Sequence, residues 1–190
     1  MQYVKQHFFN TLEVKQSKFI AHLIPYNTYD SVLQKLKQEH PKARHFVVAY
    51  RYLNEFNQIV EHSSDDGEPK GTSGKPSLMV LQGKEIINCA VIVVRYFGGT
   101  KLGTGGLVRA YSDAVNLVLK SAVLFEYAHE IEKTISFKYS DIRVVEYEAS
   151  IYKVEIIEKY FDTDAVYKVK ANKEDLNTFL DSLKRVIKVR

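Results

Sequence analysis

The sequence predicts an α+β protein of two domains, and three observations lead to this prediction. The chain has 190 residues, of which 45% are apolar and 26% charged, and these are ordinary values for a folded globular protein. All nine glycines lie between Gly67 and Gly106, whereas the last third of the chain has neither glycine nor proline. Apolar residues alternate along some segments and recur at helical spacing along others. We therefore expect one domain over residues 1–131 and a second over residues 132–190.

The elements of the first domain follow its hydrophobic pattern. We expect, in order, strands at 2–9 and 12–25, a helix at 29–39, strands at 44–53 and 58–63, a helix at 77–82, a strand at 86–96 and a helix at 105–121. Asn27 or Thr28 should cap the first helix, and Pro41 prevents its continuation. The run 86–96 is too uniformly apolar for a strand with one wet face, so it should lie at the centre of the sheet.

The second domain has a simpler order of elements. We expect a strand at 134–139, a helix at 141–152, strands at 153–161 and 165–171, a helix at 173–184 and a strand at 186–190. Asn172 should cap the last helix, with Asp175 as its partner three residues on. The order βαββαβ is typical of a ferredoxin-like sandwich.

Cysteine content and hydropathy indicate the compartment. The single cysteine, Cys89, has no partner for an intramolecular disulfide, which favours a reducing environment. It starts the most apolar strand, so we expect a buried, inert thiol. The longest apolar run is too short to cross a membrane, and residues 1–19 lack the features of a signal peptide. We expect a soluble, cytoplasmic protein with no membrane partner.

The middle of the chain is the best candidate for binding an anion. Residues 70–110 hold six basic side chains and one acidic side chain, while the whole chain has a net charge of +4. A glycine-rich turn at 98–106 precedes a helix, and exposed amides at a helix N-terminus attract anions. Lys101 and Arg109 oppose the helix dipole there, and a bound anion would remove that conflict. The alternative is that Arg109 simply reaches solvent or a carboxylate elsewhere.

Specific nucleotide fingerprints are absent from this region, since neither the dinucleotide pattern nor the phosphate-loop pattern is complete. Tyr96 and Phe97 are candidate stacking surfaces for bases. The candidate nucleic-acid or anion-binding residues are Lys70, Lys75, Arg95, Tyr96, Gly98, Gly99, Lys101, Gly103, Gly105, Gly106 and Arg109.

A second candidate site is the polar loop that follows the strand at 58–63. Its candidate residues are His45, Asp65, Asp66, Glu68 and Thr72. Three carboxylates in one loop are able to hold Mg²⁺, but the same residues are equally typical of a turn, which we favour. No spacing of histidines or cysteines indicates zinc, and the sequence shows no convincing catalytic set. We therefore expect no resident cofactor and lean away from an enzyme.

Two long segments carry a resemblance to a known family, SSDDGEPKGTSGKP at 63–76 and VVRYFGGTKLGTGGLVRAY at 93–111. With them, the chain resembles the bacterial YigZ group of the IMPACT family over nearly its whole length. The resemblance implies that residues 1–131 fold like the second domain of ribosomal protein S5. It also implies that residues 132–190 resemble a ferredoxin-like domain of elongation factor G. Eukaryotic members of the family regulate translation, and for the bacterial group the resemblance implies association with nucleic acid or the ribosome.

Three functional hypotheses follow from the sequence. The leading hypothesis is a non-catalytic protein that binds RNA or the ribosome through residues 67–109. The second is a Mg²⁺-dependent enzyme acting on a phosphorylated small molecule, with the metal at Asp65, Asp66 and Glu68. The third is a protein-interaction module of the IMPACT type, with a protein as its partner.

Overall fold

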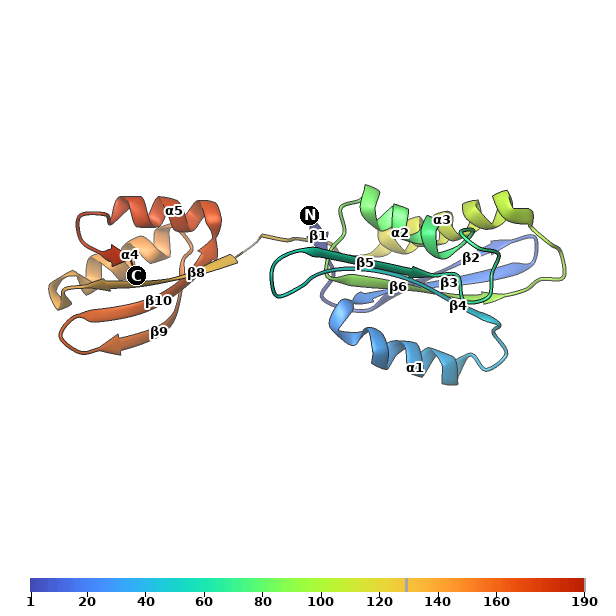
Figure 1. Cartoon of the computed structure of the whole chain (residues 1–190), viewed down its shortest axis with the longest axis horizontal. Helices are drawn as coiled ribbons and strands as arrows, with labels where there is room; N and C mark the ends of the chain where they lie inside the picture. The colour runs from blue at the N-terminus through green and yellow to red at the C-terminus, as the bar shows by residue number, and fades with distance from the viewer. Residues whose placement is uncertain (129, 190) are drawn as a thin grey trace. The chain divides into compact units, whose positions relative to one another are not determined.

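The chain divides into two compact units, Met1–Tyr127 and Ala128–Arg190, in a computed structural model that describes residues 1–128 and 130–189 (Figure 1). Each unit has its own sheet, its own helices and its own apolar core. We call them unit 1 and unit 2. The two units, each with a sheet and helices, confirm the predicted α+β architecture in two parts. None of the helices in the described part of the chain has the length and apolarity needed to span a bilayer.

Unit 1 is built on a five-stranded antiparallel sheet with the strand order β2-β3-β6-β4-β5. Its strands are β2 (Phe8–Val14), β3 (Ser17–Pro25), β4 (His45–Leu53), β5 (Ile59–Ser64) and β6 (Cys89–Tyr96). The apolar run in β6 lies at the centre of the sheet, as predicted, and its residues from Cys89 to Arg95 are buried. A separate pair of short strands, β1 (Gln2–Tyr3) and β7 (Phe125–Glu126), is also antiparallel.

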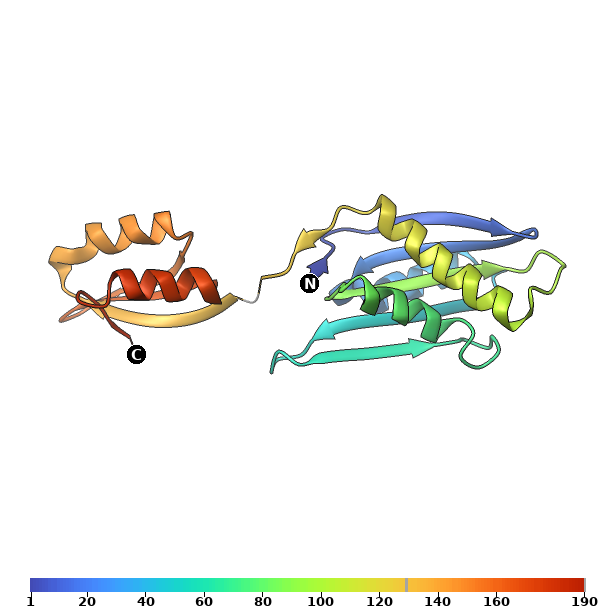
Figure 2. The same cartoon turned by 90° about the horizontal axis from the view of Figure 1, so that it is seen from above.

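Helices cover the two faces of this sheet unequally (Figures 1 and 2). Two helices, α2 (Gly74–Gly83) and α3 (Gly103–Ser121), lie on one face, while α1 (Tyr29–Glu39) lies alone on the other. Because successive side chains of a strand point to opposite faces, β6 contributes Val91 and Val93 to the core under α2 and α3. The alternate residues Ile92 and Val94 pack under α1.

Helix boundaries differ from prediction where local hydrogen bonds decide them. Thr28 is the N-cap residue of α1, one of the two predicted positions, but its side chain makes no capping hydrogen bond. Its hydroxyl donates instead to the Pro25 carbonyl oxygen within a 3₁₀ turn, Tyr26–Thr28. Helix α2 begins at Gly74 and not at residue 77, since the Asp65 carboxylate accepts a hydrogen bond from the Gly74 amide. Helix α3 likewise begins at Gly103, two residues before the predicted start.

Unit 2 has the predicted order βαββαβ. Its elements are β8 (Glu130–Phe137), α4 (Ile142–Ile151), β9 (Glu155–Phe161), β10 (Ala165–Asn172), α5 (Lys173–Ser182) and β11 (Lys188–Val189). The four strands pair antiparallel in the order β11-β8-β10-β9. The predicted cap of α5 is confirmed, because Asn172 Oδ1 accepts a hydrogen bond of 2.8 Å from the Asp175 amide.

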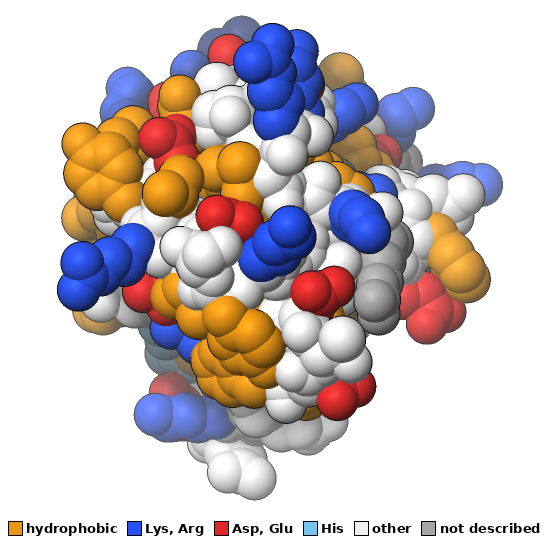
Figure 3. Space-filling view, turned by 90° about the vertical axis from the view of Figure 1, so that its left-hand side faces the viewer, with side chains coloured by type: hydrophobic (Ala, Val, Ile, Leu, Met, Phe, Trp, Pro, Cys, Tyr) orange, Lys and Arg blue, Asp and Glu red, His pale blue; other side chains and the backbone are white. Residues whose placement is uncertain are grey.

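The outward face of this second sheet is strongly charged. Lys168 lies between Glu132, at 2.7 Å, and Glu158, at 3.8 Å, so opposite charges on neighbouring strands neutralise one another. In the space-filling view toward unit 2, hydrophobic side chains form separate patches between charged ones (Figure 3). Strand β8 begins before the predicted residue 134, because its first residues pair with β10. The polar sequence of these residues did not indicate a strand.

Candidate functional site

The strongest candidate site lies at one end of unit 1, where β5 and β6 end and where α2 and α3 begin (Figure 2). A cavity of about 350 Å³ opens there between the loop after β5 and the loop after β6. It is lined by Glu68, Pro69, Arg95, Phe97, Lys101, Leu102, Gly103, Thr104 and Leu107. We call it the α3 pocket. Both loops belong to the two segments that the sequence singled out, so the structure brings those segments together.

A buried ion pair forms the floor of the α3 pocket. The Arg95 guanidinium lies 2.5 Å from Glu68 Oε1, and the Tyr111 hydroxyl donates to the same oxygen at 2.7 Å. Burial, with the charge of Glu68 as the next cause, raises the pKa of Tyr111 well above its usual value, so the hydroxyl keeps its proton. These contacts join the loop after β5 to β6 and α3, and they hold the pocket in one shape.

Asp65 organises the loop that leads into α2. Its carboxylate accepts hydrogen bonds from the amides of Gly71, Ser73 and Gly74 and from the Ser73 hydroxyl, at 2.7 to 3.1 Å. Burial by itself raises the pKa of Asp65, but these donors outweigh it, so the pKa is lowered. The carboxylate therefore stays ionised at neutral pH and fixes the path of residues 65–74.

The other residues of the predicted polar-loop site also make contacts within the protein. His45 Nδ1–H donates to the Asp66 carbonyl oxygen at 2.8 Å, and the Phe46 amide donates to Asp66 Oδ2 at 2.6 Å. The Thr72 hydroxyl donates to the Pro69 carbonyl oxygen at 2.7 Å. The five predicted residues are thus neighbours, as a site would require, but the contacts of their side chains are with the protein itself and hold the loop together. Across residues 1–128 and 130–189, no three His, Cys, Asp or Glu side chains are arranged to hold a metal ion.

Lys101 lines the α3 pocket, and further cations lie in the loop after β5 and on α2 and α3, while the carboxylates of that loop are bonded within the protein. Lys70, Lys75, Lys101 and Arg109 are all exposed. None of them forms an ion pair within the described part of the chain, since Asp65, Asp66 and Glu68 are engaged elsewhere. Unneutralised positive charge therefore lies near the starts of α2 and α3. The first amides of α3 have no partner within the helix, whereas at the start of α2 the Asp65 carboxylate accepts the amides of Ser73 and Gly74.

Arg95 requires a correction, because the sequence placed it among the cations that would meet a phosphate. It is only 6% exposed, and its charge is neutralised by Glu68. Its guanidinium carbon lies 5.4 Å from the centre of the Phe19 ring and 5.8 Å from that of Phe97. Arg95 thus belongs to the interior support of the site and does not present its charge to solvent.

Tyr96 also requires a correction, because it lies on the opposite face of the sheet from Arg95. It packs against the core under α1, and its hydroxyl is hydrogen-bonded to His40 Nδ1 at 2.9 Å. The next residue, Phe97, is 50% exposed and lines the α3 pocket. The aromatic surface available for stacking at this site is therefore Phe97.

The glycines of the turn have two different roles. A Cβ at Gly98 would lie 2.0 Å from the Gln16 carbonyl carbon, so this glycine permits close contact with the turn between β2 and β3. Gly99 and Gly103 have positive φ angles of 86° and 74°, which other residues rarely adopt. Gly105 has open space around it, and Gly106 has only the Leu102 side chain near. The start of α3 is accessible because these residues carry no side chains.

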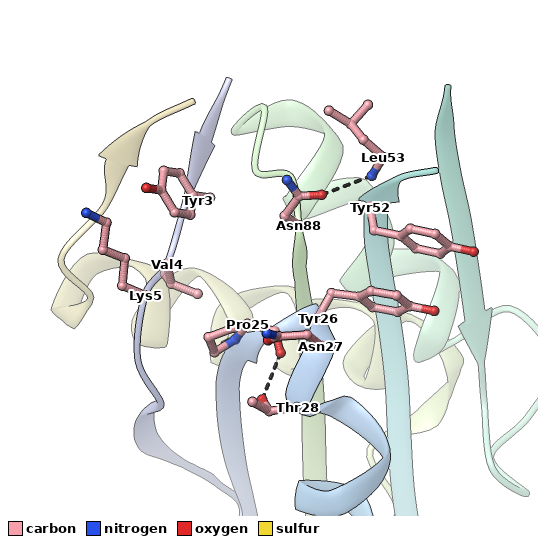
Figure 4. A pocket seen from close by; sticks show the side chains of 10 residues that line it. All are labelled: Tyr3, Val4, Lys5, Pro25, Tyr26, Asn27, Thr28, Tyr52, Leu53 and Asn88. Carbon is pink, nitrogen blue, oxygen red and sulfur yellow. Dashed lines mark hydrogen bonds between the residues drawn. The ribbon is translucent and has the colours of Figure 1, made fainter. Parts of the chain in front are cut away.

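Two other clusters were not identified from the sequence. At the far end of the sheet, a cavity of about 530 Å³ is lined partly by Tyr26 and Tyr52, whose rings stack with centres 4.0 Å apart (Figure 4). On the α1 face, His7, His22 and His40 lie near one another. The alternation Tyr50-x-Tyr52 in β4 was a signal for the first cluster, but no local pattern indicated the second, whose members are far apart in the chain.

Comparison with known proteins gives a consistent picture. The family model described as the Impact N-terminal domain matches residues 15–119. An IMPACT family member of Haemophilus influenzae is 40% identical over 159 residues, which cover 80% of this chain and 75% of that protein. The IMPACT family member YigZ of Escherichia coli is 37% identical over 137 residues, which cover 70% of this chain and 67% of that protein. A crystal structure described as a hypothetical protein has a TM-score of 0.65 at 28% identity. The match covers 99% of this chain and 95% of that one.

Proposed function

The chain belongs to the IMPACT family, and from this premise we propose that it is a non-catalytic protein that binds RNA, free or in the ribosome, through the loops between residues 67 and 109. The observation that carries the proposal is the separation of charge at the α3 pocket. The acidic side chains of the loop after β5 are bonded within the protein, and four basic side chains remain at the surface. Phosphate groups are complementary to such a surface.

The start of α3 supplies the second part of the argument. The first residues of an α-helix have amides without partners inside the helix, and α3 begins with Gly103, Thr104, Gly105 and Gly106. Its cap residue Leu102 offers no side-chain hydrogen bond to these amides. A phosphate oxygen is able to approach the backbone here, with Lys101 lining the same pocket.

An exposed aromatic ring supports RNA over a small inorganic anion. Phe97 lines the pocket beside Lys101, so a base stacked on this ring would have its phosphate near the lysine and the start of α3. We further propose that unit 1 has the fold of the second domain of ribosomal protein S5, and unit 2 that of a ferredoxin-like domain. A role in regulating translation accords with both parts of this proposal.

Fluorescence anisotropy with a labelled single-stranded RNA tests the proposal. Affinity should fall as salt rises, with a slope of log affinity against log salt of about −0.7 for each phosphate contact. The double variant Lys101→Ala/Arg109→Ala should remove most of the binding. The matched control is Lys84→Ala/Lys120→Ala, which removes the same charge at the other end of α2 and α3. Equal loss in both variants, or binding that does not depend on salt, would contradict the proposal.

A phosphorylated small molecule is a second candidate ligand, because the α3 pocket is an open hollow of about 350 Å³ and more than a flat basic surface. Calorimetry with nucleotides, with and without Mg²⁺, distinguishes the two. Nucleotide binding that excludes RNA would favour the small molecule. A pull-down from cell extract with and without ribonuclease separates RNA from a protein partner, since only capture through RNA is lost after digestion.

A further inference from the structure

A second site lies on the α1 face of unit 1. A single α-helix is about 10 Å wide, whereas five strands at about 4.8 Å spacing make a sheet nearly twice as wide, so α1 leaves the flank over β2 and β3 uncovered. A cavity of about 440 Å³ occupies this flank, and that volume is typical of ligand pockets. Its lining residues are His7, Phe9, Thr11, Lys18, Ile20, His22, Val32, Lys35, Leu36, Glu39 and His40.

His22 is the unexplained residue in this cavity. Its side chain is only 6% exposed, and its Nδ1 is hydrogen-bonded to His7 Nε2 at 2.9 Å. Its Nε2 is buried and has no hydrogen-bond partner among the described residues. A buried polar atom left without a partner costs about 1–3 kcal/mol, which a ligand atom at this position would recover.

The walls around His22 are apolar and the mouth is charged. The Phe9 ring stacks on the His22 ring with centres 5.9 Å apart, and Ile20 and Leu36 are buried beside it. At the mouth, Lys35 pairs with Glu39 at 3.6 Å, while Lys18 forms no ion pair within the described residues. The cavity therefore combines an apolar wall, one unpartnered imidazole nitrogen and one unpaired cation.

We propose that this cavity binds a small amphiphilic carboxylate, whose apolar part lies against Phe9, Ile20 and Leu36 and whose carboxylate accepts a hydrogen bond from His22 Nε2–H near Lys18. The hydrogen bond between the two histidines permits the tautomer that the proposal requires. When His7 Nε2–H donates to His22 Nδ1, a neutral His22 carries its proton on Nε2, which is then available to donate to a ligand. The proposal is independent of RNA binding at the α3 pocket.

The charges around His22 agree with an anionic ligand. Burial, then His7 from the segment before β2 and His40 at the end of α1, lowers the pKa of His22 to about 4. The ring is therefore neutral at pH 7 in the free protein. Lys18, Lys35 and Glu39 are the other charged groups that line this cavity. A carboxylate placed against the ring favours the imidazolium, so binding should raise the pKa of His22.

NMR titration of the labelled full chain with octanoate tests the proposal. Octanoate should shift the His22 ring signals and the methyl signals of Ile20 and Leu36, and it should raise the pKa of His22. Octylamine has a chain of similar length without the carboxylate and should not bind. The variant His22→Phe keeps the ring stacking on Phe9 and should weaken octanoate binding at least tenfold. The control His62→Phe alters a histidine that stacks on Tyr50 in the same unit and should leave binding unchanged.

A second variant keeps the test decisive if His22→Phe does not fold. Lys18→Met removes the unpaired cation from an exposed position and should weaken octanoate binding at least threefold. Octanoate shifts confined to residues outside this cavity would overturn the proposal. So would octylamine binding as tightly as octanoate, or octanoate binding to His22→Phe and Lys18→Met as tightly as to the unaltered chain.

Discussion

Glu68 and Arg95 form an ion pair at 2.5 Å in the interior of unit 1, with the two side chains only 3% and 7% exposed. The pair joins a loop to the central strand of the sheet at the floor of the α3 pocket. A buried ion pair adds little stability compared with an apolar pair, but removing one partner leaves an uncompensated charge in the interior. The shape of the pocket therefore depends on both residues together.

The variant Glu68→Gln should strongly destabilise unit 1. It leaves the Arg95 charge buried without a counterion, and we expect a loss of about 3–5 kcal/mol in the free energy of unfolding. Urea denaturation of the full chain, followed by signals from unit 1, measures this. The double variant Glu68→Gln/Arg95→Met should recover a large part of the loss. A double variant as unstable as Glu68→Gln alone would show that the unpaired charge is not the cause.

Gly98 and Gly105 should respond oppositely to substitution by alanine. Gly98→Ala brings a Cβ against the backbone of Gln16, and the loop must move, at a cost of about 1–3 kcal/mol. Gly105→Ala adds a methyl group in open space near the start of α3 and should be neutral or stabilising by up to about 1 kcal/mol. Thermal unfolding of the two variants checks this. Equal effects would contradict the close contact at Gly98.

The sequence predicted the fold far better than the contacts of its polar residues. The centre of the sheet at β6 and the cap at Asn172 followed from local pattern, because burial and capping are properties of neighbouring residues. The local pattern did not predict the contacts of Arg95 and Tyr96, although these two residues are consecutive in the chain. Alternation along a strand places them on opposite faces, but only tertiary structure shows that Glu68 lies within reach of Arg95. The positive charge of residues 70–110 was visible in the sequence, but the contacts of Asp65, Asp66 and Glu68 within the protein were not.

Removal of the Asp65 carboxylate should release the loop between β5 and α2. Asp65→Ala removes the acceptor of four hydrogen bonds, three of them from backbone amides, and should cost about 2 kcal/mol. The loop should then be cleaved faster by trypsin after Lys70, which is measured by limited proteolysis. The control is Asp113→Ala, an exposed acidic residue on α3, whose cleavage rate should equal that of the unaltered chain.

Cys89 should be inert in the folded protein. The thiol is buried in β6, and burial raises its pKa to about 12, so almost no thiolate forms at pH 8. A thiol reagent such as Ellman's reagent should react only when unit 1 unfolds, and the reaction rate should rise with urea. Rapid reaction without denaturant would show that the central strand opens in the native state.

The stability of unit 1 should fall as the pH drops from about 6.5 to about 4, because of His22. Its pKa is lowered to about 4 in the folded protein by burial, then by His7 and His40, whereas in the unfolded chain it returns to 6.5. Between these values the unfolded chain binds a proton that the folded chain does not, so protonation favours unfolding. The stabilisation is complete above pH 6.5 and is lost progressively down to pH 4. With 1.36 kcal/mol for each pKa unit and allowance for partial solvation, the loss should be about 2–3 kcal/mol.

Urea denaturation at pH 7 and pH 4.5 measures this loss of stability, and His22→Phe should lose correspondingly less over the same interval. If both proteins lose stability equally, acidic destabilisation of unit 1 comes from other groups and His22 is not neutral in the folded state.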